Sequence, residues 1–174
     1  MLNTSSPEIH VLTTSKCNLR CIYCGISGEH TDSSQHIDMD EKILSKIITI
    51  LSKEDFVKNV TFSGGEVTTR KDWMEITDRF IKVNCQVNAI LNLQRILKDS
   101  EVSFLMNFST LLISIDSANR SILAETRLHS KLEHISLNII KLKSEILRSG
   151  SKTNLRATSV IGTRNFEQLT DLLY

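Results

Sequence analysis

The feature that most restricts the fold of this chain is a regular alternation of short apolar runs with longer amphipathic ones. Short runs rich in β-branched residues predict strands at 9–13, 60–62, 86–91, 111–116 and 154–160. Apolar residues at helical spacing predict helices at 41–51, from about 72, at 94–108 and at 135–147, and a fifth helix is expected after the last strand, towards Tyr174. Such alternation implies a parallel sheet with right-handed crossovers. We therefore expect an α/β fold, a barrel-like sheet of about five strand–helix units in a single domain over residues 1–174.

Three of the four cysteines crowd one loop directly after the first predicted strand. Cys17, Cys21 and Cys24 lie in the run KCNLRCIYCG at positions 16–25. Thiolates are the preferred ligands of iron–sulfur clusters, and cysteines at this spacing can surround one cluster. Three ligands leave one iron of a four-iron cluster open, and an open coordination site is where metal chemistry occurs. The loop therefore predicts a 4Fe–4S cluster with these three cysteines as metal ligands, whereas Cys85, in a distant apolar stretch, is predicted to be a core residue.

Two other roles of the cysteines, a zinc site and disulfide bonds, have less support in the sequence. A structural zinc site needs a fourth ligand, and His10, His30 and His36 match no zinc-ribbon or zinc-finger spacing. A disulfide framework is disfavoured because the chain has four cysteines in 174 residues and three share one loop. A zinc-stabilised interaction domain stays open as an alternative.

A second motif, FSGGEV at positions 62–67, follows the second predicted strand. Gly64 and Gly65 allow a tight turn without a Cβ that would obstruct a ligand. Glu66, just past the strand, could accept hydrogen bonds from an ammonium group. Most turns of this composition only reverse the chain, so the motif gains its weight from the cysteine loop upstream.

Together the two motifs resemble the radical S-adenosylmethionine (radical SAM) superfamily. Its signature is a cysteine, three residues, a second cysteine, and an aromatic residue directly before the third cysteine. Cys17, Cys21, Tyr23 and Cys24 match every position, and the run 59–72 is similar to the family's second strand with its Gly-Gly-Glu turn. The resemblance covers roughly residues 9–174 and implies a partial barrel of the radical SAM type. Because the family uses six strand–helix units and five are predicted, the core domain is expected to be incomplete at its C-terminus.

The resemblance also implies cofactors and an activity. The cofactors are a 4Fe–4S cluster and S-adenosylmethionine, whose reductive cleavage yields a 5′-deoxyadenosyl radical that abstracts hydrogen from an unidentified substrate, with peptide modification as the expected class. Relatives place Tyr23 at the adenine, Gly64, Gly65 and Glu66 at the methionine amino group, and Ser114 at the ribose. The electron comes from a donor such as flavodoxin or ferredoxin. No general acid or base can be named.

Several positions near these motifs are ambiguous or depart from the family pattern. Asp116 suits either a turn cap or a polar contact with the ligand, and Arg127 lies where relatives place an arginine near the methionine carboxylate. Relatives often show Thr-Asn-Gly after the third strand; the nearest match here centres on Asn88, which predicts that one ribose contact is missing. Val67 replaces a usual proline, and residues 159–162 could pack against adenine.

Charge and composition limit the partners. With 21 basic and 20 acidic residues the net charge is +1, so no polyanion-binding face is implied and nucleic acid is not required. No apolar run is long enough for a membrane span and residues 1–8 lack signal-peptide features, so a cytoplasmic protein is expected. The last predicted strand carries one charge, so its open edge predicts self-association or a partner segment. The alternative function is a non-catalytic iron–sulfur module derived from a truncated barrel.

Overall fold

A computed structural model describes residues 7–53, 55–168 and 170–171. The main sheet contains β1 (Glu8–Thr14), β3 (Asn59–Gly64), β4 (Gln86–Leu91), β5 (Thr110–Ser114) and β7 (Asn154–Thr158), and a small second sheet contains β2 (Arg20–Cys21) and β6 (Arg127–Leu128). The α-helices are α1 (Glu41–Leu51), α2 (Trp73–Lys82), α3 (Asp99–Leu105), α4 (Arg120–Thr126) and α5 (Leu132–Ser149). Short 3-10 helices are η1 (Ser33–Gln35), η2 (Val67–Thr69) and η3 (Phe166–Gln168). Among the described residues, no helix is both long and apolar enough to cross a bilayer.

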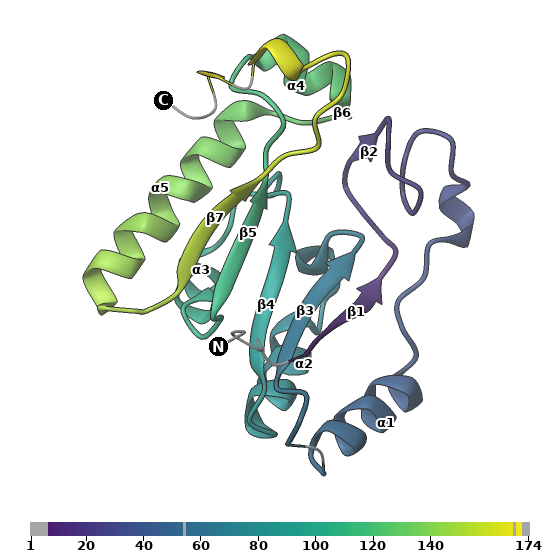
Figure 1. Ribbon diagram of the computed structural model, residues 1–174, viewed down its shortest axis with the longest axis vertical. Helices are drawn as coiled ribbons and strands as arrows, with labels where there is room; N and C mark the ends of the chain where they lie inside the picture. The colour runs from purple at the N-terminus through teal and green to yellow at the C-terminus, as the bar shows by residue number, and fades with distance from the viewer. Residues whose placement is uncertain (1–6, 54, 169, 172–174) are drawn as a thin grey trace, which may run out of the picture.

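The main sheet is parallel throughout, with strand order β1-β3-β4-β5-β7. All five strands therefore point the same way, and their carboxyl ends gather at one edge of the sheet (Figure 1). The predicted α/β class with a parallel sheet is confirmed. In such a fold, functional groups that follow the strands meet at this edge.

The core lies between the sheet and its crossover helices. Alternate residues of β4 are buried, as the two-residue period of a strand requires: Val87, Ala89 and Leu91 are each about 1% exposed or less. Phe62 of β3 packs edge-to-face on Phe80 of α2, with ring centroids 5.2 Å apart. Cys85 is buried at 6% exposure, so its predicted place in the core is confirmed.

The helix predicted at 94–108 is too long at both ends, because α3 spans only Asp99–Leu105. The segment before it is irregular: Leu93 has φ of 53°, which a helix does not permit. Asn138 of α5 donates to the carbonyls of Leu93 and Arg95 at 2.9 Å and accepts from the N–H of Leu97 at 3.0 Å. Leu93 and Leu97 are both buried, so this irregular segment also contributes apolar side chains to the core.

Two further features were not predicted. The β2–β6 pair consists of two residues on each strand, too few for a periodic pattern, and α4 is only seven residues long. The fifth helix that the sequence predicts towards Tyr174 lies partly outside the described residues.

Strand β7 lies at an edge of the main sheet, next to β5. Self-association of the chain through this edge stays a prediction. Adding a charged side chain to β7 tests it, because charges on an edge strand oppose pairing with another strand. We expect the chain to elute as an oligomer in size-exclusion chromatography with light scattering. Ala157 is exposed, and we expect Ala157→Lys to shift the chain towards the monomer. A monomer in both cases would contradict this prediction.

Candidate functional site

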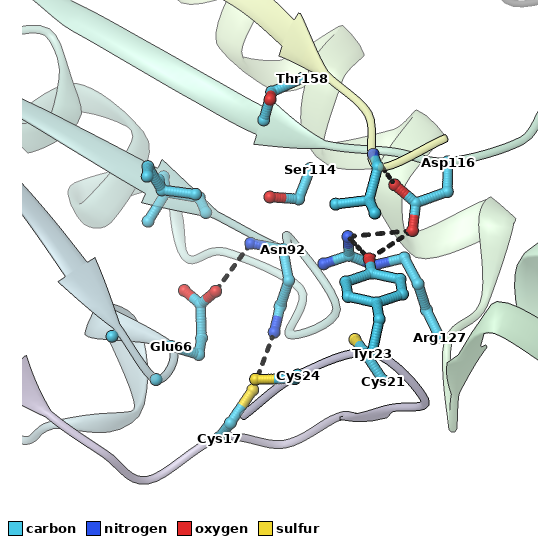
Figure 2. A pocket seen from close by; sticks show the side chains of 15 residues that line it. Cys17, Cys21, Tyr23, Cys24, Glu66, Asn92, Ser114, Asp116, Arg127 and Thr158 are labelled. Atoms are coloured by element: carbon cyan, nitrogen blue, oxygen red, sulfur yellow. Dashed lines mark hydrogen bonds and ion pairs between the residues drawn. The ribbon is translucent and has the colours of Figure 1, made fainter. Parts of the chain in front are cut away.

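A pocket of about 280 Å³ opens at the carboxyl ends of the strands (Figure 2). Its walls come from the cysteine loop, the turn after β3 and the residues at the ends of β4, β5 and β7. It is lined by Cys17, Cys21, Tyr23, Cys24, Gly64, Gly65, Glu66, Ile90, Leu91, Asn92, Ser114, Asp116, Arg127, Thr158 and Val160. Every cofactor or metal residue predicted from the sequence is in this set. The fold therefore brings together predicted site residues that lie up to 97 positions apart in the sequence, from Cys17 to Ser114.

The three thiols of the loop line this pocket, and two of them, those of Cys17 and Cys24, accept hydrogen bonds from backbone N–H groups. The N–H groups of Leu19 and Ser27 donate to the sulfurs of Cys17 and Cys24, each at 3.4 Å. Burial raises the pKa of the Cys17 and Cys21 thiols. Burial also tends to raise the pKa of the Cys24 thiol, but hydrogen bonds from the backbone of Ser27 and Ile26 outweigh this effect, so the pKa of Cys24 is lowered.

This donor set fits an iron–sulfur cluster, because soft thiolate ligands with N–H donors around the sulfurs suit iron in a partly dry site. A four-iron cluster distributes its thiolates over separate irons, so it requires sulfurs farther apart than a single ion does. Within the described ranges, no group of three His, Cys, Asp or Glu side chains is arranged to hold a single metal ion.

The two glycines of the turn pack so closely on the start of the cysteine loop that neither position has room for a Cβ. A Cβ on Gly65 would lie 2.0 Å from the carbonyl oxygen of Lys16, and one on Gly64 would lie 2.7 Å from that of Thr14. Gly64 also has φ of 104°, a conformation that side chains disfavour. The Gly65 N–H donates to Thr14 and the Glu66 N–H to Lys16, both at 2.8 Å. Packing on the cysteine loop is therefore a second reason for these glycines, beside the ligand approach that the sequence predicts, and both glycines line the pocket.

Glu66 is 2% exposed, and its carboxylate connects the turn to the end of β4. It accepts hydrogen bonds from the Thr68 hydroxyl at 2.6 Å and from the Asn92 N–H at 2.7 Å. Burial raises the pKa of this carboxyl, against the opposing effect of these donors. The carboxylate therefore orients the turn in addition to any contact with a ligand.

Asn92 was missed by the sequence interpretation, which selected Asn88 instead. Asn88 lies inside β4, whereas Asn92 directly follows the strand and reaches into the pocket. Its amide donates to Asn18 at 2.7 Å and to the sulfur of Cys17 at 3.5 Å. The following Leu93 has a positive φ, a conformation that glycine adopts more readily. A polar residue placed immediately after an apolar strand was the signal that could have identified Asn92.

Tyr23, Asp116 and Arg127 form a polar network beside Cys21, opposite Glu66 (Figure 2). The Tyr23 hydroxyl donates to the Asp116 carboxylate, and Arg127 donates to the Tyr23 oxygen at 2.9 Å. Asp116 and Arg127 are 1% and 7% exposed, with 3.5 Å between carboxylate oxygen and guanidinium nitrogen. Burial raises the pKa of Tyr23, so its hydroxyl remains a donor.

The same network connects the cysteine loop to the last strand. Asp116 also accepts from the Val160 N–H at 2.9 Å, so it serves both as a turn cap and as a polar contact in the pocket. Arg127 is paired in register with Cys21 through β2 and β6. Ser114 ends β5 and lines the pocket, as its predicted role requires.

Comparison with known proteins identifies relatives over most of the chain. The family model of the radical SAM superfamily matches residues 11–156. A probable GTP 3′,8-cyclase of Methanocaldococcus jannaschii is 27% identical over 173 residues, which cover 95% of this chain and 53% of that protein. A PqqA peptide cyclase of Bradyrhizobium diazoefficiens is 37% identical over 79 residues, covering 44% of this chain and 20% of that protein.

A solved structure shares the fold. The crystal structure of Streptococcus suis SuiB has a TM-score of 0.72 at 19% identity, covering 95% of this chain and 36% of that one. This chain thus spans about half of the M. jannaschii relative and about a third of SuiB. Because the family model covers most of the chain and includes both motifs, the chain belongs to the radical SAM superfamily, a family of enzymes that use a 4Fe–4S cluster and S-adenosylmethionine and share a partial α/β barrel.

Proposed function

We propose that this chain is the catalytic core of a radical SAM enzyme that cleaves S-adenosylmethionine reductively and abstracts hydrogen from a substrate. The observation that carries the proposal is the convergence of three cysteines, Glu66 and Ser114 on one pocket. When bound, the cluster and S-adenosylmethionine supply the electron transfer and the 5′-deoxyadenosyl radical of this chemistry. The chain's own residues bind, orient and shield these groups.

The proposed roles follow the positions of the side chains. Cys17, Cys21 and Cys24 are the cluster ligands, and the turn with Gly64, Gly65 and Glu66 binds the methionine amino group. Ser114 binds the ribose and Tyr23 borders the adenine.

Arg127 is proposed to bind the methionine carboxylate. Its Nη1 contacts Tyr23 and Asp116, but its Nε is buried and has no hydrogen-bond partner among the described residues. A buried guanidinium N–H without a partner is costly, and an anionic ligand group would satisfy it.

The substrate is proposed only as a class. The named relatives include a probable GTP cyclase and a peptide cyclase, so a nucleotide and a peptide are both candidates, and the shared chemistry is hydrogen abstraction from carbon. An electron donor such as flavodoxin or ferredoxin is the proposed partner. The second candidate function, a non-catalytic iron–sulfur module, would leave the Gly-Gly-Glu turn without a ligand role.

Anaerobic reconstitution with iron and sulfide, followed by reduction and an assay for 5′-deoxyadenosine, tests the proposal. We expect about four irons per chain and formation of 5′-deoxyadenosine that depends on S-adenosylmethionine. A chain that assembles the cluster but neither binds nor cleaves S-adenosylmethionine would instead be the non-catalytic module.

Glu66→Gln is expected to weaken binding of S-adenosylmethionine while the cluster absorbance stays unchanged. The substitution keeps the shape of the side chain but removes the charge, and a charge-assisted hydrogen bond contributes about 1.5–3 kcal/mol, roughly 10-fold to 100-fold in affinity. Glu101→Gln is the matched control, because Glu101 is also buried but pairs with Arg95 outside the pocket. Calorimetric titration of both variants measures the difference, and equal affinities would rule out the role assigned to Glu66.

A further inference from the structure

The loop that carries the cysteines is closed at its base by two short segments, residues 13–16 and 37–39. The Ser15 N–H donates to the carbonyl of Ile37, and the Met39 N–H donates to that of Thr13, both at 2.9 Å. Thr14 and Asp38 form an antiparallel bridge between these bonds. The loop therefore leaves the sheet and returns at the same place, so the position of its base sets the position of the cysteines.

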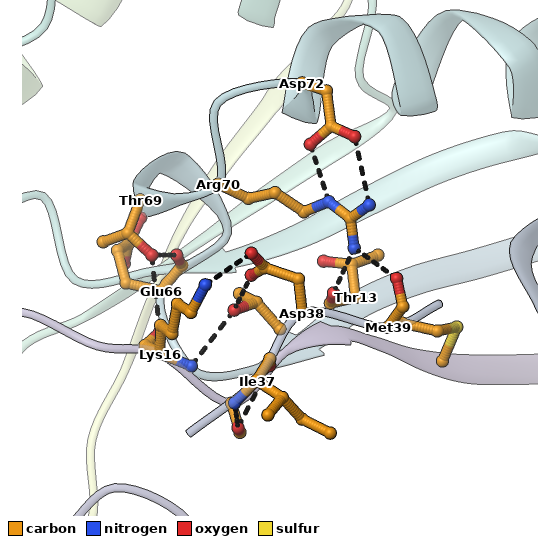
Figure 3. Close-up of polar contacts among 11 residues, drawn as sticks. Thr13, Lys16, Ile37, Asp38, Met39, Glu66, Thr69, Arg70 and Asp72 are labelled. Atoms are coloured by element: carbon orange, nitrogen blue, oxygen red, sulfur yellow. Dashed lines mark hydrogen bonds and ion pairs between the residues drawn. The ribbon is translucent and has the colours of Figure 1, made fainter. Parts of the chain in front are cut away.

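Asp38 adds side-chain contacts to this loop base. It accepts hydrogen bonds from the Thr14 hydroxyl at 2.7 Å and from the Lys16 ammonium at 2.6 Å (Figure 3). The Lys16 side chain is 49% exposed, so this ion pair contributes little to stability by itself. Its effect is to orient the Asp38 carboxylate within the loop base.

Arg70, which follows η2 in the Gly-Gly-Glu turn region, contacts both segments of the loop base at once. Its Nη1 donates to the carbonyl of Thr13 at 2.8 Å and to that of Met39 at 2.9 Å. Its Nε and Nη2 donate to the two oxygens of Asp72 at 2.7 and 3.0 Å, which fixes the plane of the guanidinium (Figure 3). The Arg70 side chain is 7% exposed, so its bonds to the two carbonyls are sheltered from water, whereas the Asp72 side chain is 42% exposed.

Backbone hydrogen bonds in the same region connect the loop base that Arg70 contacts with the Gly-Gly-Glu turn. The turn donates from Gly65 to Thr14 and from Glu66 to Lys16, so Glu66 and the cysteine loop share one set of contacts. We infer that Arg70 is a positioning residue that holds the base of the cysteine loop in register with the Gly-Gly-Glu turn. It thereby sets the distance between the cluster ligands and the cofactor-binding turn; this last consequence rests on the proposed function.

Lysine cannot replace arginine in this role. A planar guanidinium presents five donors in a fixed fork, whereas an ammonium is a single point that cannot reach two carbonyls and both carboxylate oxygens together. Arg70→Lys should therefore loosen the loop base as Arg70→Met does, although lysine keeps the positive charge. Asp72→Asn should have a smaller effect in the same direction, because it leaves the guanidinium present but less firmly oriented.

Hydrogen exchange on the metal-free chain tests the inference without any cofactor. In Arg70→Met and Arg70→Lys we expect the Ser15 and Met39 amides to exchange about 10-fold faster, since one lost buried hydrogen bond is worth roughly 1.4 kcal/mol. Amides of β4 should not change. Arg79→Met is the control, because Arg79 pairs with Glu41 on α1 and does not contact the loop base. Unchanged exchange at Ser15 and Met39 in folded Arg70 variants would overturn the inference.

A second measurement uses the reconstituted protein. In the Arg70 variants we expect faster loss of iron to a chelator and, in the reduced state, a weaker change of the cluster's EPR signal on addition of S-adenosylmethionine. A purely stabilising role would lower the unfolding temperature without changing the EPR response of the folded fraction, and that result would also overturn the inference. If the unmodified chain binds no S-adenosylmethionine, the proposed function fails while the exchange experiment still decides the role of Arg70.

Discussion

Replacing any one of Cys17, Cys21 or Cys24 by alanine is expected to abolish the iron–sulfur cluster, while Cys85→Ala retains it. The three thiols line one pocket, the sulfurs of Cys17 and Cys24 accept hydrogen bonds from N–H groups, and three ligands leave a single iron of a four-iron cluster open. Cys85 is buried in the core and does not line that pocket, so its loss affects only packing. Iron and sulfide analysis after anaerobic reconstitution measures the outcome.

The same measurement can contradict the assignment. A purified chain with one zinc per molecule and no uptake of iron would show that the loop binds zinc instead. Retention of the cluster in any of the three loop variants would show that the missing cysteine is not a ligand.

Gly65→Val is expected to remove both the cluster and the binding of S-adenosylmethionine. A Cβ at this position would lie 2.0 Å from the Lys16 carbonyl oxygen, and backbone cannot move aside as a flexible side chain can. Overpacking typically costs about 1–3 kcal/mol, and the strain here falls on the loop that carries the cysteines. The sequence alone predicts a different result, loss of the cofactor with the cluster intact, because it assigns the glycine to the ligand side.

Gly25→Ala is the matched control for this substitution. Gly25 also belongs to the cysteine loop, but a Cβ there would meet nothing within 4 Å. We expect Gly25→Ala to keep the cluster absorbance and the cofactor affinity of the unmodified chain. If Gly65→Val keeps its cluster and loses only S-adenosylmethionine, the ligand-side explanation is correct and the packing explanation is wrong.

The order of strands and helices could be predicted from the sequence because each strand carries its own local pattern. The strand predicted at 86–91 is β4 (Gln86–Leu91), and its alternate residues point into the core. The prediction failed where long-range contacts decide the backbone. Residues 94–98 are irregular because Asn138, more than 40 positions later, binds their backbone groups and those of Leu93.

The chemistry of the site divides in the same way. The cysteine loop and the Gly-Gly-Glu turn are short contiguous motifs, so the sequence by itself determined the family, the cofactors and the class of fold. The tertiary structure decided how these motifs meet. Only the folded chain shows that Gly65 packs on Lys16, that Asn92 rather than Asn88 reaches the cysteines, and that Asp116 joins Tyr23 to Arg127. Such contacts join residues that follow different strands. Which of these residues meet depends on how the parallel strands pair, and that pairing is decided between segments far apart in the sequence.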